Sequence, residues 1–111
     1  MAKLEKTLRV SFSEAVARVD SGLKSGSISL TLEDRSDFRG EGARCTVMVY
    51  ERYSYMGGNR VSLTVTFFQA GDGPVHLSAI TSGGSQAVFF KINTIGEESF
   101  LTKLEEVVQD L

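Results

Sequence analysis

The chain has 111 residues and a mass of 12.1 kDa, which is enough for one domain, residues 1–111, and too little for two. Its hydrophobic content of 41% and charged content of 23% are ordinary for a globular protein and exclude wholesale disorder. The net charge is −2, and the long uncharged stretches are rich in Ser, Thr and Gly. The sequence therefore predicts neither a membrane span nor a basic surface for nucleic acid.

Acidic residues gather near the C-terminus and would repel phosphate backbones and anionic lipids. They are Glu97, Glu98, Glu105, Glu106 and Asp110. No apolar run follows the charged residues at the N-terminus, so no signal peptide is expected. Cys45 is the only cysteine, which rules out a disulfide within the chain and favours a reducing cytoplasm as the location.

The first segment changes from strand to helix periodicity. Alternation of Leu8, Val10 and Phe12 with polar residues predicts a strand. Ser11 and Glu14 then match a capping box, which predicts that a helix begins near residue 12. Apolar residues at spacings of three and four, followed by a glycine, predict that this helix ends near residue 24.

The next two segments differ in charge. Residues 27–33 return to a period of two and predict a strand. Residues 34–42 are the most charged part of the chain, and we expect a loop there in which Phe38 is the one apolar anchor.

The remaining strands are separated by glycine-rich turns. Residues 44–55 and 60–69 predict two strands, and the Met-Gly-Gly-Asn sequence at 56–59 predicts a tight hairpin between them, because glycine and asparagine accept positive φ. Residues 75–80 and 87–92 predict two more strands, joined by a turn at 82–85.

An amphipathic helix is predicted after residue 94, with an apolar stripe on one side. The chain order is then strand, helix, five strands, helix. Consecutive strands joined by tight turns pair antiparallel. We therefore expect an α+β fold in which an antiparallel sheet of five or six strands carries both helices on one face, similar to a helix-grip or TATA-binding-protein-like fold.

Two phenylalanine pairs bear on the uncovered face of this sheet. Phe67-Phe68 and Phe89-Phe90 each occupy adjacent strand positions, so each pair places one ring on either face. With helices on only one face, Phe68, Ile80 and Phe89 are left for the other and form a candidate interface. The 34–42 segment, a second copy of the chain or a bound ligand would cover them. The alternative is a neutral, solvated face of ordinary strand residues.

A polar cluster flanks the predicted hairpin. Tyr50, Arg52, Tyr53 and Arg60 are the candidate ligand-binding residues, because tyrosine supplies rigid area with a polar tip and arginine supplies planar donors for an anion. The alternative is that these side chains pair across the strands and stabilise the hairpin.

The sequence leans against an enzyme without excluding one. His76 is the only histidine, so it does not assemble a multi-histidine metal site. Cys45 and His76 fall on non-neighbouring strands and are expected on opposite faces, which weakens a Cys–His dyad. The serines lack a Gly-x-Ser-x-Gly elbow. No catalytic residue, metal ion or cofactor is assigned.

Three segments of the sequence resemble a family of short bacterial proteins known as a domain of unknown function. The segments are ERYSY at 51–55, GGNRVSL at 57–63 and AITSGGSQAVFFKINT at 79–94. The resemblance spans nearly the whole chain and implies a bacterial, single-domain protein. It implies no activity and no site residue.

These observations favour a non-enzymatic cytosolic binding module that self-associates, as a homodimer, through the neutral sheet surface. The first alternative is a carrier of an unidentified small ligand with a pocket between the sheet and the C-terminal helix. The second alternative is an enzyme that uses a single acid or a substrate-assisted mechanism. Neither nucleic acid nor a membrane is expected as a partner.

Overall fold

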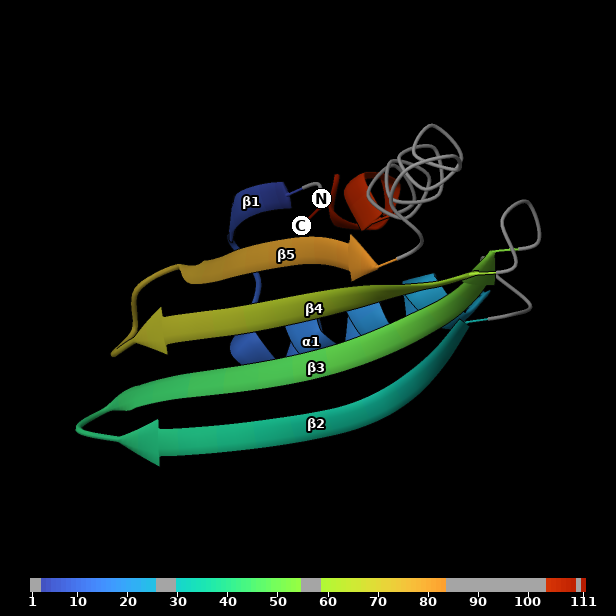
Figure 1. The fold of residues 1–111 in the computed structure, drawn as a ribbon. Coiled ribbons are helices and arrows are strands. Elements are labelled where there is room, and N and C mark those ends of the chain that lie inside the picture. Colours follow the sequence, from blue (N-terminus) through green and yellow to red (C-terminus); the bar gives the residue numbers. More distant parts are fainter. Residues whose placement is uncertain (1–2, 26–29, 55–58, 84–103, 110) are drawn as a thin grey trace.

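The computed structural model describes residues 3–25, 30–54, 59–83, 104–109 and 111, which form an antiparallel sheet with helices packed against it (Figure 1). The elements are β1 (Lys3–Leu8), α1 (Phe12–Ser25), β2 (Leu30–Gly40), β3 (Ala43–Ser54), β4 (Asn59–Ala70) and β5 (Val75–Gly83). Residues 104–108 form a short C-terminal helix. The α+β class, the five-stranded sheet and the two helices are as the sequence predicts.

Helix α1 begins where the capping box predicts. The Ser11 hydroxyl accepts a hydrogen bond from the Glu14 amide at 3.2 Å, so this side chain satisfies a donor that the first helical turn leaves unpaired. The backbone carbonyl of Ser11 accepts a second hydrogen bond from the Ala15 amide at 2.9 Å. The strand before it, however, ends at Leu8. The prediction that alternation continues through Val10 to Phe12 is wrong, because the chain must turn before Ser11 caps the helix.

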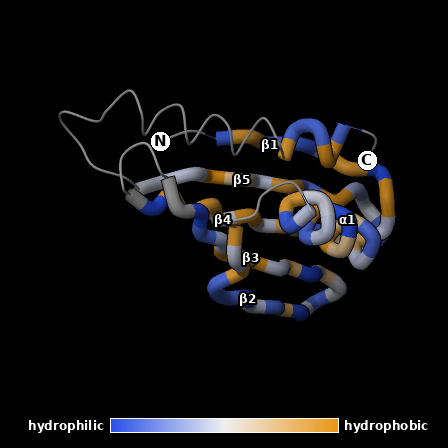
Figure 2. The backbone as a smooth tube through the Cα atoms, turned by 90° about the vertical axis from the view of Figure 1, so that its right-hand side faces the viewer, coloured by the Kyte–Doolittle hydropathy of each residue, from blue (hydrophilic) through white to orange (hydrophobic). Residues whose placement is uncertain are grey.

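The strands lie in the order β1-β5-β4-β3-β2, with β4 at the centre. Figure 2 shows this stack with α1 on one side of it. Every neighbouring pair is antiparallel, including β1 with β5, which are far apart in the sequence. Three of these pairs are hairpins between consecutive strands, as the turn signals predict.

The core fills the space between the sheet and the helices. In β4 the buried side chains are Val61, Leu63, Val65 and Phe67, each with 0–1% of its surface exposed. Leu104 and Val108 of the C-terminal helix, at 0% and 2%, belong to the same cluster. A Cβ at Gly22 of α1 would lie 2.6 Å from a methyl group of Val107, so the two helices pack closely. Both helices therefore cover the same face.

Strand β2 corrects the prediction of a loop at residues 34–42. It runs to Gly40 and turns back to β3 through Glu41 and Gly42, whose φ values of 53° and 78° suit a two-residue hairpin turn. The strand lies at one edge of the described sheet, and residues 33–40 are exposed. Charged side chains are tolerated on such an edge strand, where they discourage edge-to-edge pairing. Phe38 is not an anchor, since 62% of its surface is exposed.

The other hairpins agree with the sequence in part. Strands β3 and β4 pair as far as Ser54 and Asn59, which confirms the hairpin; residues 55–58 lie outside the described part. Strand β5 continues to Gly83, so the prediction that a turn begins at residue 82 is wrong; residues 84 and 85 lie outside the described part. The predicted strand at 87–92, with Phe89, and the first part of the final helix also lie outside the described residues. Within the described ranges, no helix is long and apolar enough to cross a bilayer.

Candidate interaction surface

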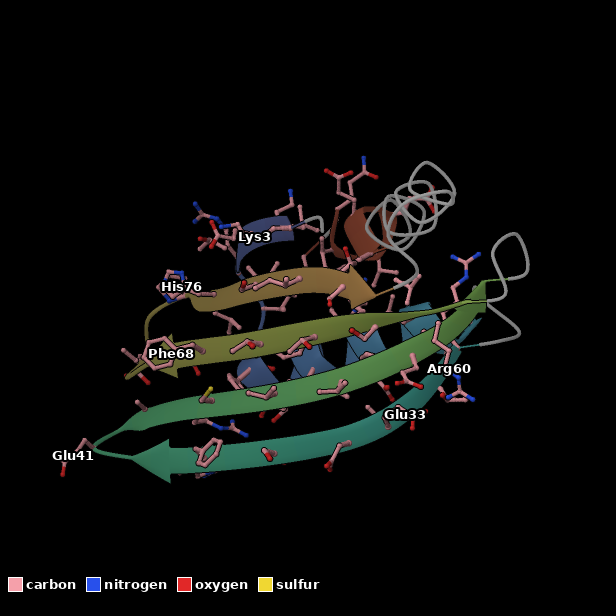
Figure 3. The ribbon with its side chains drawn as sticks, in the orientation of Figure 1. Lys3, Glu33, Glu41, Arg60, Phe68 and His76 are labelled. Carbon is pink, nitrogen blue, oxygen red and sulfur yellow. The ribbon has the colours of Figure 1, made fainter. Side chains whose placement is uncertain are left out.

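The first phenylalanine pair divides between the two faces of the sheet, as strand alternation predicts. Phe67 is fully buried and makes an edge-on contact with Phe12, the ring centroids being 6.3 Å apart. Phe68, the next residue, leaves 43% of its surface exposed on the opposite face, where Ile80 leaves 39%. Figure 3 shows Phe68 on the side of the sheet that faces away from α1.

We call the centre of this uncovered side the open face. It consists of the outward-facing side chains of three neighbouring rows of β3, β4 and β5, all half-buried or exposed. They are Cys45, Val47, Val49, Thr64, Thr66, Phe68, His76, Ser78 and Ile80. Glu51 and Arg60 lie on the same side beyond these rows. The open face therefore carries neutral polar and apolar groups and no Lys, Arg, Asp or Glu.

One cross-strand row of the sheet holds two of the three exposed large apolar side chains of the described residues. Phe38, Cys45, Phe68, His76 and Thr7 are successive partners across β2, β3, β4, β5 and β1. The row combines the two most exposed large apolar side chains of the described chain, Phe38 and Phe68. Phe38 was missed as a surface group because the sequence placed it in a loop. We call these five residues the aromatic row.

A shallow groove of about 430 Å³ lies at the β1 side of the open face. Its lining includes Thr7, Thr66, Phe68, His76 and Ser78, so it spans the aromatic row and the row beside it. The Thr7 hydroxyl and His76 Nδ1 are 3.5 Å apart at its rim. The groove is therefore part of the same surface as the exposed rings.

Charged side chains border the open face on the edge strands. Lys3 and Glu5 lie on β1, beside Ile80 and Ser78 of β5, and Asp34 lies on β2 beside Val49 of β3. No ion pair joins Lys3 or Asp34 to another side chain in the ranges that the structure describes. In the row of Thr64, the neutral centre thus has Lys3 at one end and Asp34 at the other.

The structure does not bring the four predicted ligand residues together. Tyr50 pairs with Leu63 on the face that the helices cover, and it is fully buried. Arg52 pairs with buried Val61 on that same face. Arg60 is on the open side and forms an ion pair with Glu51 at 2.8 Å.

The fourth predicted residue, Tyr53, is the ladder partner of Arg60; its side chain lies outside the described part. Arg52 and Arg60 therefore lie on opposite faces of neighbouring strands and do not form one anion site.

Tyr50 is a structural group of the core. Its hydroxyl donates a hydrogen bond to Asp20 Oδ1 of α1 at 2.6 Å, and Lys24 Nζ lies 3.1 Å from Asp20 Oδ2. Burial raises the pKa of the Tyr50 hydroxyl well above its usual range, and the carboxylate of Asp20 raises it further, since a tyrosinate there would be desolvated and repelled. This contact joins α1 to the centre of β3.

A second polar group lies between α1 and the β2 edge. Asp37 accepts hydrogen bonds from Arg35 Nε at 3.0 Å and from the Thr46 hydroxyl at 2.7 Å, and these bonds lower the pKa of its carboxyl. The Arg44 guanidinium stacks 4.2 Å from the ring centroid of Phe12. A groove of about 320 Å³ lies beside these groups. Sequence reasoning missed this cluster because it treated Arg35 and Asp37 as loop residues.

Cys45 and His76 share the open face, and the prediction that they lie on opposite faces is wrong. They occupy β3 and β5, and Phe68 of β4 stands between them in the aromatic row. The two side chains are therefore separated by a strand and do not form a dyad. Among the described residues, no group of three or more His, Cys, Asp or Glu side chains converges as a metal site.

Comparison with known proteins gives the fold and a family. No curated protein matches the chain. A solved structure, the protein of unknown function PA94 from Pseudomonas aeruginosa, is similar with a TM-score of 0.52 and 15% identity, over 91% of this chain and 81% of that one. An uncharacterised protein from Rhizobium leguminosarum has a TM-score of 0.40 and 13% identity, over 99% and 94% of the two chains.

The first similarity supports the fold alone. The matching family model spans residues 1–111, and the chain belongs to the family described as "Family of unknown function (DUF6054)".

Proposed function

We propose that this protein is a non-catalytic binding module that self-associates as a homodimer through its open face. The observation that carries the proposal is the exposure of Phe38, Phe68 and Ile80, at 62%, 43% and 39%, on the side of the sheet that no described helix covers. Exposed apolar side chains gathered on one surface mark interaction sites more often than isolated ones do.

The composition of the open face also supports an interface. The centre of a protein–protein interface is depleted in charge and rich in aromatic and apolar groups, and its rim is polar. Here the neutral centre is bordered by Lys3, Glu5 and Asp34 on the edge strands.

The size of the face sets the expected affinity. Strands lie about 4.8 Å apart, so five strands span about 24 Å; rows that extend about 20 Å along them give a footprint of roughly 500 Å² per copy. Two copies would bury roughly 1,000 Å², which is the lower limit for a specific interface. We therefore expect a dissociation constant in the micromolar range.

The internal contacts do not favour a ligand carrier as the leading function. The Tyr50 hydroxyl already donates to Asp20, and Leu104 and Val108 pack into the core beneath the C-terminal helix.

We further propose that the bacterial cytoplasm is the location and that the sheet curving around α1 corresponds to a helix-grip arrangement, as the sequence suggests.

Light scattering after gel filtration, over loading concentrations from about 5 to 500 µM, tests the proposal. The mass should rise from 12.1 kDa toward twice that value in the wild type. Phe68→Thr, which keeps a strand-forming residue but removes the ring, should shift the rise to higher concentration. A constant monomer mass for the wild type would refute the proposal.

A further inference from the structure

We propose that the two copies in this dimer are related by a two-fold axis that runs along β4, so that Phe38 of each copy fills the groove of the other. This inference rests on the proposed function and adds the arrangement of the partner. In the arrangement, β4 lies over the partner's β4, β5 over the partner's β3, and β1 over the partner's β2.

The strand order makes such an axis self-complementary. Strand β4 is the middle strand of the described sheet, with two strands on either side. A rotation of the partner by 180° about the direction of β4 exchanges the β1 and β2 sides of the sheet and keeps each cross-strand row at the same position along the strands. Each row then faces the same row of the partner, with its residues in the reverse order from β1 to β2.

Charge complementarity supports this axis. One row runs Lys3, Ile80, Thr64, Val49 and Asp34 from β1 to β2. The rotation places Lys3 opposite the partner's Asp34, Ile80 opposite the partner's Val49, and Thr64 opposite itself. The two edge charges of opposite sign therefore meet, twice in each dimer, around an apolar and neutral centre.

Shape supports the same axis. In the aromatic row, the rotation places Phe68 opposite the partner's Phe68, and Cys45 opposite the partner's His76. It also brings Phe38, the most exposed large apolar side chain of the described residues, over the partner's Thr7. Thr7 lines the 430 Å³ groove, together with Phe68 and His76. A protruding ring on one edge thus meets a hollow on the other.

The usual geometry of packed sheets is compatible with these contacts. Sheets pack about 10 Å apart with strands inclined by about 30°. At the edge strands, two strands from the axis, this inclination displaces the facing residues by about 5 Å. The groove spans two rows, and the stem of Lys3 is long enough to follow such a displacement.

An axis perpendicular to the strands fits less well. Centred on the open face, it would place the aromatic row over the row of Thr64, which puts Phe38 against the partner's Asp34 and so opposes a carboxylate to an exposed ring. Centred on the aromatic row, it would pair Phe38 with the partner's Phe38 but leave the row of Thr64 and Ile80 outside the contact.

A charge-reversal series tests the edge contacts. Lys3→Glu or Asp34→Lys should each raise the dissociation constant about tenfold at low ionic strength, because like charges then face each other. The double variant should return it to within about threefold of the wild type. Arg39→Glu is the matched control, since Arg39 is on β2 but pairs with Arg44 on the opposite face; it should leave the constant unchanged. Absence of rescue in the double variant would overturn the axis.

Pulsed electron paramagnetic resonance gives the axis directly. Asp72→Cys in a Cys45→Ser background, which light scattering must first show to dimerise as the wild type does, places one spin label in the exposed turn between β4 and β5. The proposed axis brings the two turns to the same end of the dimer and predicts a label separation below about 25 Å. A perpendicular axis centred on the open face places them a strand's length apart, about 40 Å for the 12 residues of β4.

The outcomes separate the two proposals. A distance near 40 Å, or the absence of rescue, would leave the homodimer in place and refute only the axis. A protein that stays monomeric in light scattering would refute the homodimer and the axis with it.

Discussion

Substitution of Phe68 should weaken the dimer far more than it weakens the fold, whereas substitution of its neighbour Phe67 should do the reverse. Phe68 leaves 43% of its surface exposed. For a residue with about 200 Å² of surface, this is about 85 Å², worth ~2 kcal/mol per copy when covered at 25 cal/mol per Å². Phe68→Thr should therefore raise the dissociation constant by between about 30-fold, for one ring, and about 1,000-fold, for both.

The cost to folding is smaller, because the ring is only partly buried in the monomer. We expect Phe68→Thr to lower the free energy of unfolding by about 1 kcal/mol. Phe67 is fully buried against Phe12, so Phe67→Ala should cost about 3–5 kcal/mol. Phe67→Leu, which keeps the site apolar, should cost less than about 1.5 kcal/mol and leave the dissociation constant within about twofold.

Sedimentation velocity gives the dissociation constants, and urea unfolding at concentrations well below them gives the monomer stabilities. The reasoning is refuted if Phe68→Thr and Phe67→Leu change the dissociation constant equally. It is also refuted if Phe68→Thr destabilises the monomer as strongly as Phe67→Ala does, since that result would place Phe68 in the core.

Three further predictions concern the packing that supports the open face. Tyr50→Phe removes the hydrogen bond to Asp20 and should lower the free energy of unfolding by about 1–2 kcal/mol at neutral pH. Because folding raises the pKa of Tyr50, the wild type also loses stability as the pH rises above the unfolded pKa of about 10. Urea unfolding in alkaline buffers should therefore show a shallower loss of stability in Tyr50→Phe, whereas an equal loss would contradict the burial of this hydroxyl. Gly22→Ala should lower the melting temperature despite the better helix propensity of alanine, because the new methyl group meets Val107 at 2.6 Å. Calorimetry should show that adding Val107→Ala restores the melting temperature. A double variant that does not recover would contradict the packing of the C-terminal helix on α1. Gly83→Ala should cost more than about 1 kcal/mol in urea unfolding, since its φ is 122° and its Cβ would lie 2.6 Å from the Arg60 carbonyl oxygen; an unchanged midpoint would contradict the position of β5 against β4.

Strand phase was the part of the structure that the sequence predicted best. The alternation in β4 and β5 fixes which side chains are buried, so Phe67 falls in the core and Phe68 and Ile80 fall on the open face. The capping box likewise predicts the start of α1, because the Ser11 hydroxyl bonds a backbone amide within the same turn. Both signals are local.

The errors arose where tertiary position decided the outcome. Charged residues 34–40 resemble a loop, yet they form an edge strand because both sides of that edge are solvated. The position of β1 beside β5 depends on a pairing between residues about 70 positions apart, which no local pattern encodes. Cys45 and His76 were assigned to opposite faces for the same reason, since their relative face depends on the registers of two ladders.

Tyr50 shows the same limit for a single side chain. Composition made Tyr50 a candidate ligand contact, but its ladder partner Leu63 places it in the core, where its hydroxyl donates a hydrogen bond to Asp20 of α1. A polar side chain that lies on the buried phase of a strand is thus better interpreted as a core group with an internal partner.

A dilution series followed by methyl NMR tests most directly whether a second copy covers the open face. Between millimolar and low micromolar concentration, the methyl signals of Ile80, Val47 and Val49 should shift along one common binding curve, while those of Leu63 and Val65 in the core stay fixed. Signals that do not move at any concentration, or shifts confined to the core methyl groups beneath the helices, would contradict the account.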